Sequence, residues 1–284
     1  MERMRKSAVS GSFYEADPED LKKQIEWCFM HPIGPRELPK LREPSISRRL
    51  IGIISPHAGY MYSGPVAAHG YYKVASDGKP DLIIIIGPNH TGYGPSVSVM
   101  SEGIWETPLG KVRIDSTIAK KIISGCKYAK DDHIAHIYEH SVEVQLPFLQ
   151  YIFGSDFRFV PIVMMIQEVE TAECLGNSIA KAVENENVLL IASSDLTHYE
   201  PHEKAIKKDG ILIKSVLSMD IKELFKTVYM HDISACGPGA IASVIHASRI
   251  LGANSITLLK YATSGDVSGD KSHVVGYSSL AIEK

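Results

Sequence analysis

The sequence predicts an α/β protein, a single three-layer domain over residues 1–284 with a central mostly parallel or mixed β-sheet and helices on both faces. Three apolar, largely β-branched runs have the composition of strands buried on both sides: residues 50–54, 82–86 and 188–192. Segments with helical spacing separate these runs, as expected of parallel strands joined by helices. A chain of 284 residues with 44% hydrophobic content can bury one large core.

In the first half of the chain, Asp17 before Pro18 favours a helix start, and a turn over residues 59–65 is expected to precede a second helix. A hairpin beside the sheet and one further helix should follow. These elements are short strands at 97–100 and 112–114, a turn at 105–110 between them, and a helix over 116–125.

A histidine-rich segment opens the second half. His133, His136 and His140 are spaced as on one helical face, which would suit a metal, but apolar helical spacing begins only at Val142. We therefore retain only His140 as a candidate, in contact with a metal ligand or a substrate. The remaining expected elements are a strand at 157–164, helices at 175–183, 220–230 and 238–251, and strands at 256–261 and 274–282 around a flexible segment, 264–273.

Composition excludes several classes of partner. The formal net charge is -3 and the pI is about 6.5, so there is no basic surface for nucleic acid and no polybasic membrane anchor. No apolar stretch approaches the length of a membrane span, and we expect a cytoplasmic protein. Four scattered cysteines form no CxxC pair, which favours reduced thiols.

Polar residues follow each of the three buried strands. Asn89 and His90 come after the second strand, His57 after the first, and Asp195 and His198 after the third. Open α/β sheets bind ligands at the carboxyl ends of their strands. If the three strands are adjacent and parallel, these side chains share one cleft.

The residue types indicate a metal site. Histidine nitrogens bind iron, copper and zinc, and His57 and His90 are the first two expected ligands. Two candidates remain open for the third. Asp195 would complete a two-histidine, one-carboxylate site typical of non-haem iron(II), whereas Cys236, placed before a helix that starts near Gly237, would give a softer thiolate site.

The candidate that does not bind the metal is expected beside it. Asp195 and His198 could form a pair in which the carboxylate fixes the imidazole tautomer and the imidazole moves a proton. Tyr60 and Asn89 lie next to site residues in sequence and are candidates for contact with a ligand.

Six motifs in one order resemble the Memo (mediator of cell motility) family over nearly the whole chain. They are PHAGY at 56–60, GPNH at 87–90, WETPLG at 105–110, EHSVEVQLP at 139–147, SSDLTH at 193–198, and CG at 236–237. The family is similar in fold to class III extradiol dioxygenases, which hold non-haem iron(II) with two histidines and a glutamate. This chain differs from the dioxygenases in having Cys236 where they have a carboxylate, and from many family members in having Tyr199 and Glu200 after the SSDxxH motif.

The resemblance implies that His57, His90 and Cys236 bind the metal, with Asp195 and His198 beside them and His198 in the place of the dioxygenases' acid–base histidine. It implies iron(II) first, with copper or zinc as alternatives. The expected function is a metal-dependent oxidoreductase acting on a small molecule or dioxygen. Two other functions stay open: a non-catalytic module that binds a small molecule or peptide in the same cleft, and a thiol hydrolase with Cys236 as nucleophile. A homo-oligomer is compatible with the sequence.

Overall fold

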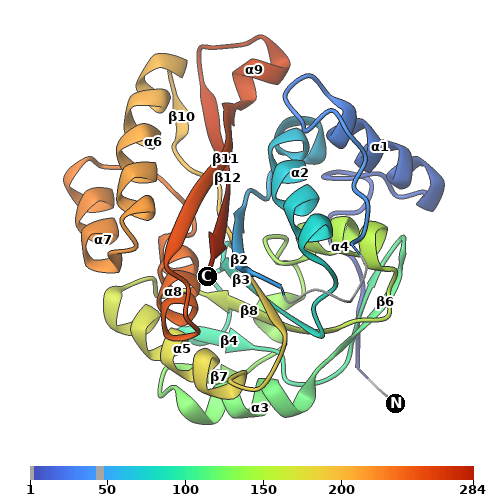
Figure 1. Cartoon of the computed structure of the whole chain (residues 1–284), viewed down its shortest axis with the longest axis vertical. Coiled ribbons are helices and arrows are strands. Elements are labelled where there is room, and N and C mark those ends of the chain that lie inside the picture. Colours follow the sequence, from blue (N-terminus) through green and yellow to red (C-terminus); the bar gives the residue numbers. More distant parts are fainter. Residues whose placement is uncertain (1–2, 43–47) are drawn as a thin grey trace.

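The computed structural model describes residues 3–42 and 48–284, which form an α/β fold around one mixed sheet (Figure 1). The strands in this part of the chain are β1 (Met4–Arg5), β2 (Leu50–Ser55), β3 (Leu82–Pro88), β4 (Val97–Val99), β5 (Ile104–Thr107), β6 (Gly110–Ile114), β7 (Ala129–Asp131), β8 (Arg158–Met164), β9 (Val188–Ser193), β10 (His198–Glu200), β11 (Ser255–Thr263) and β12 (Val274–Glu283). The helices are α1 (Pro18–Met30), α2 (Tyr60–Asp77), α3 (Ser116–Gly125), α4 (Leu146–Phe153), α5 (Val169–Ala182), α6 (His202–Leu217), α7 (Ile221–Met230), α8 (Pro238–Ile250) and α9 (Ser264–Ser268).

The centre of the sheet is parallel and fully buried. Strands β8, β3, β9 and β2 are adjacent in that order and run in the same direction. Every residue of β2, β3 and β9 is buried, as their unbroken apolar runs predicted. Because β9 lies between β2 and β3, the loops after these three strands emerge side by side at one edge.

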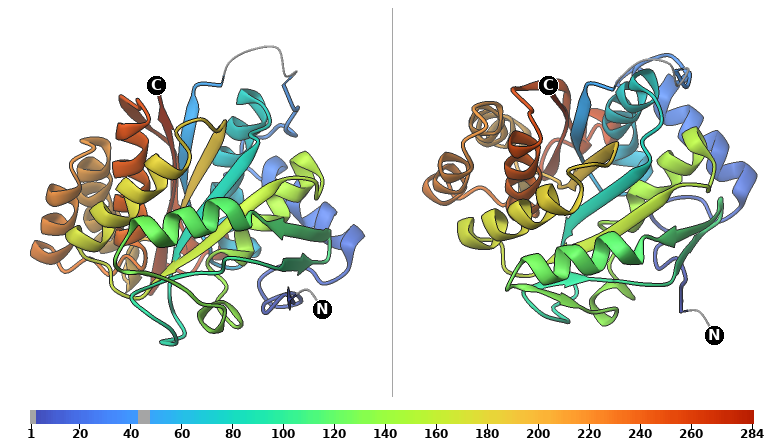
Figure 2. Two further views of the ribbon diagram at one scale, coloured as in Figure 1. Left: turned by 90° about the horizontal axis from the view of Figure 1, so that it is seen from below. Right: turned by 60° about the horizontal axis from the view of Figure 1, so that its bottom comes forward.

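Helices cover both faces of this sheet, as the sequence predicted. Helices α2 and α4 lie on one face with α1 packed against them, and α3, α5 and α8 lie on the other (Figures 1 and 2). Helices α6 and α7 extend the second layer beside β11 and β12. Among the described residues, none of the helices combines the length and apolar character needed to cross a bilayer.

Three local expectations were wrong. Helix α2 begins at Tyr60 rather than after a turn at 59–65, because the amides of Tyr62 and Ser63 already bond to the carbonyl of Gly59. Trp105 lies in β5 rather than in a turn, since β5 and β6 pair up to the close of their hairpin. The segment expected to be flexible contains α9, which a reciprocal capping box starts.

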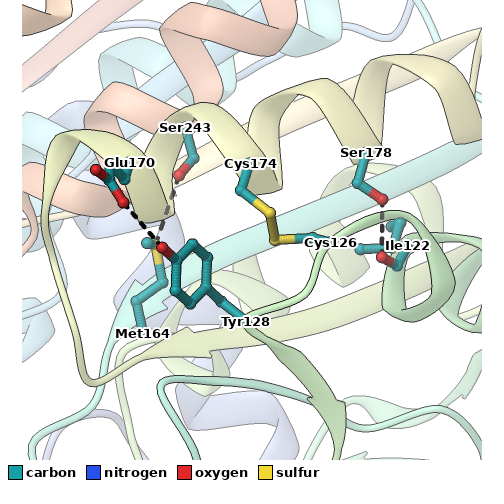
Figure 3. Close-up of a disulfide and its surroundings, with 8 residues drawn as sticks. All are labelled: Ile122, Cys126, Tyr128, Met164, Glu170, Cys174, Ser178 and Ser243. Atoms are coloured by element: carbon teal, nitrogen blue, oxygen red, sulfur yellow. Dashed lines mark hydrogen bonds between the residues drawn. A yellow bond between two sulfur atoms is a disulfide. The ribbon is translucent and has the colours of Figure 1, made fainter.

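The expectation of reduced thiols was also wrong for two cysteines. Cys126, which follows α3, forms a disulfide with Cys174 on α5 (Figure 3). Two hydrogen bonds flank it, from the Tyr128 hydroxyl to Glu170 at 3.0 Å and from the Ser178 hydroxyl to the Ile122 carbonyl at 2.7 Å. Sequence spacing could not predict this pair, because it depends on α3 packing against α5.

Removal of this disulfide should destabilise the fold. The bond closes a chain separation of 48 residues, for which loop entropy predicts a loss of about 4 kcal/mol in the free energy of unfolding. Denaturant titration of a C126A/C174A variant measures the change, and wild type with and without a reductant is the control. An unchanged midpoint in both comparisons would contradict a stabilising role for the bond.

Candidate metal centre

Three side chains from distant segments meet at the carboxyl edge of the parallel strands. His57 follows β2, His90 follows β3, and Cys236 directly precedes α8 with its N-cap Gly237. One ligand atom from each of these three residues lies within 4.8 Å of the other two. Of the two sequence candidates for a third ligand, the structure therefore groups Cys236, and not Asp195, with the two histidines.

The His57 ring has a defined tautomer. Its Nδ1 lies 2.8 Å from the hydroxyl of Ser193, and that hydroxyl donates its single proton to the carbonyl of Ser141 at 2.6 Å. Ser193 must therefore accept a hydrogen bond from Nδ1 of His57, which places the ring proton there. The Nε2 lone pair is left facing Cys236, whose sulfur lies 3.2 Å away.

A buried amide fixes this arrangement further. Gln145 donates to Ser193 Oγ at 2.8 Å and to the Pro56 carbonyl at 3.0 Å, and its oxygen accepts the Tyr71 hydroxyl at 2.5 Å. Burial, followed by the charges of neighbouring histidines, lowers the pKa of His57 well below its ordinary value. The ring is thus neutral, as a metal ligand must be.

His90 is oriented by a buried carboxylate. Glu139 accepts the backbone amide of His90 at 2.5 Å and its ring Nδ1 at 3.0 Å, and it also accepts the amide of Ser141 at 2.8 Å. Although burial raises the pKa of Glu139, its contacts with His90 and the charge of His140 lower it to about 2. An ionised carboxylate only accepts, so Nδ1 of His90 carries a proton and Nε2 is the nitrogen left for a metal.

The Cys236 sulfur accepts the amide of Asp195 at 3.2 Å. Its backbone is also held, because Gln167 accepts the amide of Gly239 at 2.9 Å and donates to the Cys236 carbonyl at 2.7 Å. Burial and then the Asp195 carboxylate raise the pKa of the thiol. A bound cation would be needed to stabilise its thiolate, so the geometry suits a metal ligand better than the free nucleophile of a thiol hydrolase.

Asp195 and His198 do not form the expected hydrogen-bonded pair. Asp195 instead accepts the backbone amide of His57 at 2.8 Å. The Nδ1 of His198 lies 2.7 Å from the carbonyl of Leu196 and 2.9 Å from that of Ser234. Carbonyls only accept, so they fix the same Nδ1-protonated tautomer that a carboxylate would have fixed, and Nε2 of His198 is left as the basic nitrogen.

The other sequence candidates are placed differently. The His140 ring stacks on His90 at 4.6 Å between centroids and lies 5.4 Å from His57, so it belongs to the centre. Tyr60 is buried, with its hydroxyl bonded to the Val144 carbonyl, and Asn89 uses its side-chain oxygen to close the turn after His90. The Tyr60 hydroxyl and the Asn89 side-chain oxygen thus form hydrogen bonds within the protein, which gives them a structural role rather than a role in ligand binding.

The residues that sequence reasoning missed are Glu139, Ser193 and Gln145. Glu139 and His140 are adjacent in the EHS sequence, and a carboxylate beside a histidine was the available signal. Glu139 also belongs to a second group with metal-ligand spacing, with His90 and His140. Its oxygen is already within hydrogen-bond distance of the His90 Nδ1, so this group acts here as the support of His90.

Fold and site together define an α/β protein with a candidate metal centre at the strand-end edge of a mixed sheet. The chain belongs to the Memo family, since residues 5–281 match the family described as Memo-like protein. A MEMO1 family protein of Methanopyrus kandleri is 48% identical over 99% of both chains, and one of Sulfolobus acidocaldarius is 50% identical over 98% of both. Family membership, expected from six motifs, is thus confirmed.

Solved structures that share this fold include one at low sequence identity. It is the crystal structure of an uncharacterized protein from Escherichia coli K12, with a TM-score of 0.54 and 12% identity. The match covers 82% of this chain and 99% of that chain. At this identity the likeness supports the architecture alone.

The Asp195 carboxyl should make the metal-free protein sensitive to pH. Burial raises its pKa from 3.8 to about 6, so the folded state holds this proton more tightly than the unfolded chain. Ionisation of Asp195 therefore lowers the free energy of unfolding. This loss is absent below the pKa of Asp195 in the unfolded chain and complete above its pKa in the folded protein. Asp195→Asn keeps an acceptor for the His57 amide and removes that loss.

We expect the stability of Asp195→Asn relative to wild type to rise by about 2 kcal/mol between about pH 4 and pH 6.5, since one pKa unit corresponds to about 1.4 kcal/mol and part of the full shift lies outside this range. Urea titrations across this range measure the difference, with Asp156→Asn as the exposed-site control. A difference that shrinks as pH rises would contradict the raised pKa.

Proposed function

We propose that His57, His90 and Cys236 bind one divalent or redox metal ion, and that the protein is a metal-dependent oxidoreductase acting on a small molecule or dioxygen. The observation that carries the proposal is the pair of imidazoles, each with Nδ1 bonded to an acceptor and Nε2 left for a metal. Two neutral imidazoles and one sulfur suit iron(II), copper or zinc. We place iron(II) first because of the resemblance to the extradiol dioxygenases.

A bound metal would supply Lewis acidity or redox chemistry, and three protein ligands leave coordination positions for a substrate. His198 has the geometry of a proton carrier, because its Nδ1 is committed to two carbonyls and its Nε2 is available. Asp195, with its pKa raised by burial to about 6, is a second group that can hold a proton near neutral pH.

His140 is the group that we propose faces the substrate. Its ring is one-fifth exposed and stacks on His90. Burial lowers its pKa to about 4, so the imidazole is neutral and can hydrogen-bond a ligand without adding charge to the centre. The expected ligand is a small molecule, and cytoplasmic location and homo-oligomer formation stay predictions.

A non-catalytic binding module is the alternative function, and one observation favours it. Exposed aromatic or thioether side chains closely follow three of the histidines in sequence: Met61 and Tyr62 after His57, Tyr93 after His90, and Tyr199 after His198, with exposures of 60%, 41%, 59% and 73%. Such side chains can contact a peptide or an aromatic ligand without any turnover.

Metal content tests the proposed ligands directly. We expect one iron or copper ion per chain in anaerobically loaded wild type, and a strong loss of bound metal in His57→Ala, His90→Ala and Cys236→Ser. Elemental analysis measures the stoichiometry. The control is His246→Ala, which removes a histidine outside the grouped ligands that hydrogen-bonds to Asn177 at 3.1 Å. Equal metal content in all five proteins would reject the site.

Oxygen consumption separates the enzyme from the binding module. With the metal-loaded protein and a panel of catechols, His198→Ala should lower turnover by about 10²- to 10⁴-fold, the usual contribution of a general acid–base group. Its metal content should not change, because His198 is not one of the three grouped ligands. Ligand binding without turnover in every metal form would favour the module instead.

A further inference from the structure

Arg5, at the end of β1, is a buried cation far in sequence from the metal centre. Its side chain is only 3% exposed and forms an ion pair with Glu143, which is completely buried. The guanidinium also donates to two backbone carbonyls, from Nε to His136 at 2.9 Å and from Nη2 to Glu139 at 2.6 Å. All of these acceptors lie within residues 136–143.

Glu143 ties the N-terminal segment to the same place. Besides Arg5, its carboxylate accepts the amide of Ala8 at 2.8 Å, the amide of Val9 at 3.1 Å and the hydroxyl of Tyr14 at 2.5 Å. A buried ion pair is stable only when such additional bonds satisfy it, and breaking one partner leaves an uncompensated charge. Residues 5–14 are thus clamped onto residues 136–143.

Glu139 connects this clamp to the metal centre. Its backbone carbonyl is held by Arg5, and its carboxylate holds both the amide and the ring Nδ1 of His90. The Trp105 ring stacks on the guanidinium, with 4.3 Å between the guanidinium carbon and the ring centroid, and so covers one face of it. The position of the Glu139 carboxylate therefore depends on an arginine that does not touch His90.

We infer that Arg5 is a positioning residue of the metal centre. It fixes the backbone at Glu139, and through that carboxylate it fixes the tautomer and ring orientation of His90. The part of this inference that concerns metal affinity rests on the proposed function, whereas the part that concerns the His90 ring does not.

The test compares two buried arginines. Arg5→Met removes the clamp. Arg48→Met removes another buried ion pair, between Arg48 and Asp77 at 3.2 Å, in which each side chain is 7% exposed. This pair lies near the start of β2 and the end of α2, whereas the metal centre lies near the end of β2 and the start of α2. Imidazole ¹⁵N NMR of the metal-free proteins reports the His90 tautomer, and titration with Co²⁺ reports affinity and the ligand-field spectrum. Denaturant titration measures how strongly each variant is destabilised.

We expect Arg5→Met to lose the single Nδ1-protonated form of His90 and to bind Co²⁺ about 10- to 100-fold more weakly, the usual effect of altering a group that orients a metal ligand. Arg48→Met should keep both properties at a comparable loss of stability. Arg5→Lys, which keeps the charge but lacks the planar fork that reaches several acceptors, should show the same changes to a smaller degree, and it replaces Arg5→Met if that variant does not fold.

An unchanged His90 tautomer in the Arg5 variants, or the same change in Arg48→Met, would overturn the inference. If wild type failed to bind Co²⁺ while the NMR difference persisted, the proposed function would fail and the positioning role of Arg5 would stand.

Discussion

The centre depends on one constraint: the Nδ1 edge of each grouped imidazole is bonded to an acceptor. Ser193 accepts from His57 because its own proton goes to a carbonyl, and Glu139 accepts from His90 because a carboxylate has no proton to give. An imidazole without such a partner exchanges its proton between two nitrogens and rotates about χ2. These two bonds therefore determine that the Nε2 atoms, and not N–H groups, are left for a metal beside the Cys236 sulfur.

The fold provides this constraint through strand order. Because β9 lies between β2 and β3, Ser193 at the end of β9 is adjacent to Ser55 in register and close to the loop that carries His57. Ser193, Glu139 and Gln145 are buried at this edge, so their hydrogen bonds are made in a medium where an unpaired polar group is costly. The same strand packing therefore determines both the position of the His57 ring and its tautomer.

The sequence predicts the parts of this centre that lie on regular structure. The unbroken apolar runs identify three central strands, and the residues directly after them, His57 and His90, follow from topology. Glu139 could not be placed in this way, because it lies in irregular backbone between two short 3₁₀ helices, Ile134–His136 and Glu143–Gln145. In such a segment no regular repeat of the sequence predicts the direction in which a side chain points. The Cys126–Cys174 bond depends on tertiary packing, and so does the Ser234 carbonyl beside His198. The expected Asp195–His198 pair was wrong because His198 uses carbonyls as its partners instead.

Burial and the Asp195 carboxylate raise the pKa of the Cys236 thiol in the metal-free chain, which favours its protonated form. A protonated thiol reacts slowly with electrophiles and peroxides, because the thiolate is the reactive form. The newly folded chain therefore keeps its sulfur chemically dormant, in spite of the two imidazoles beside it.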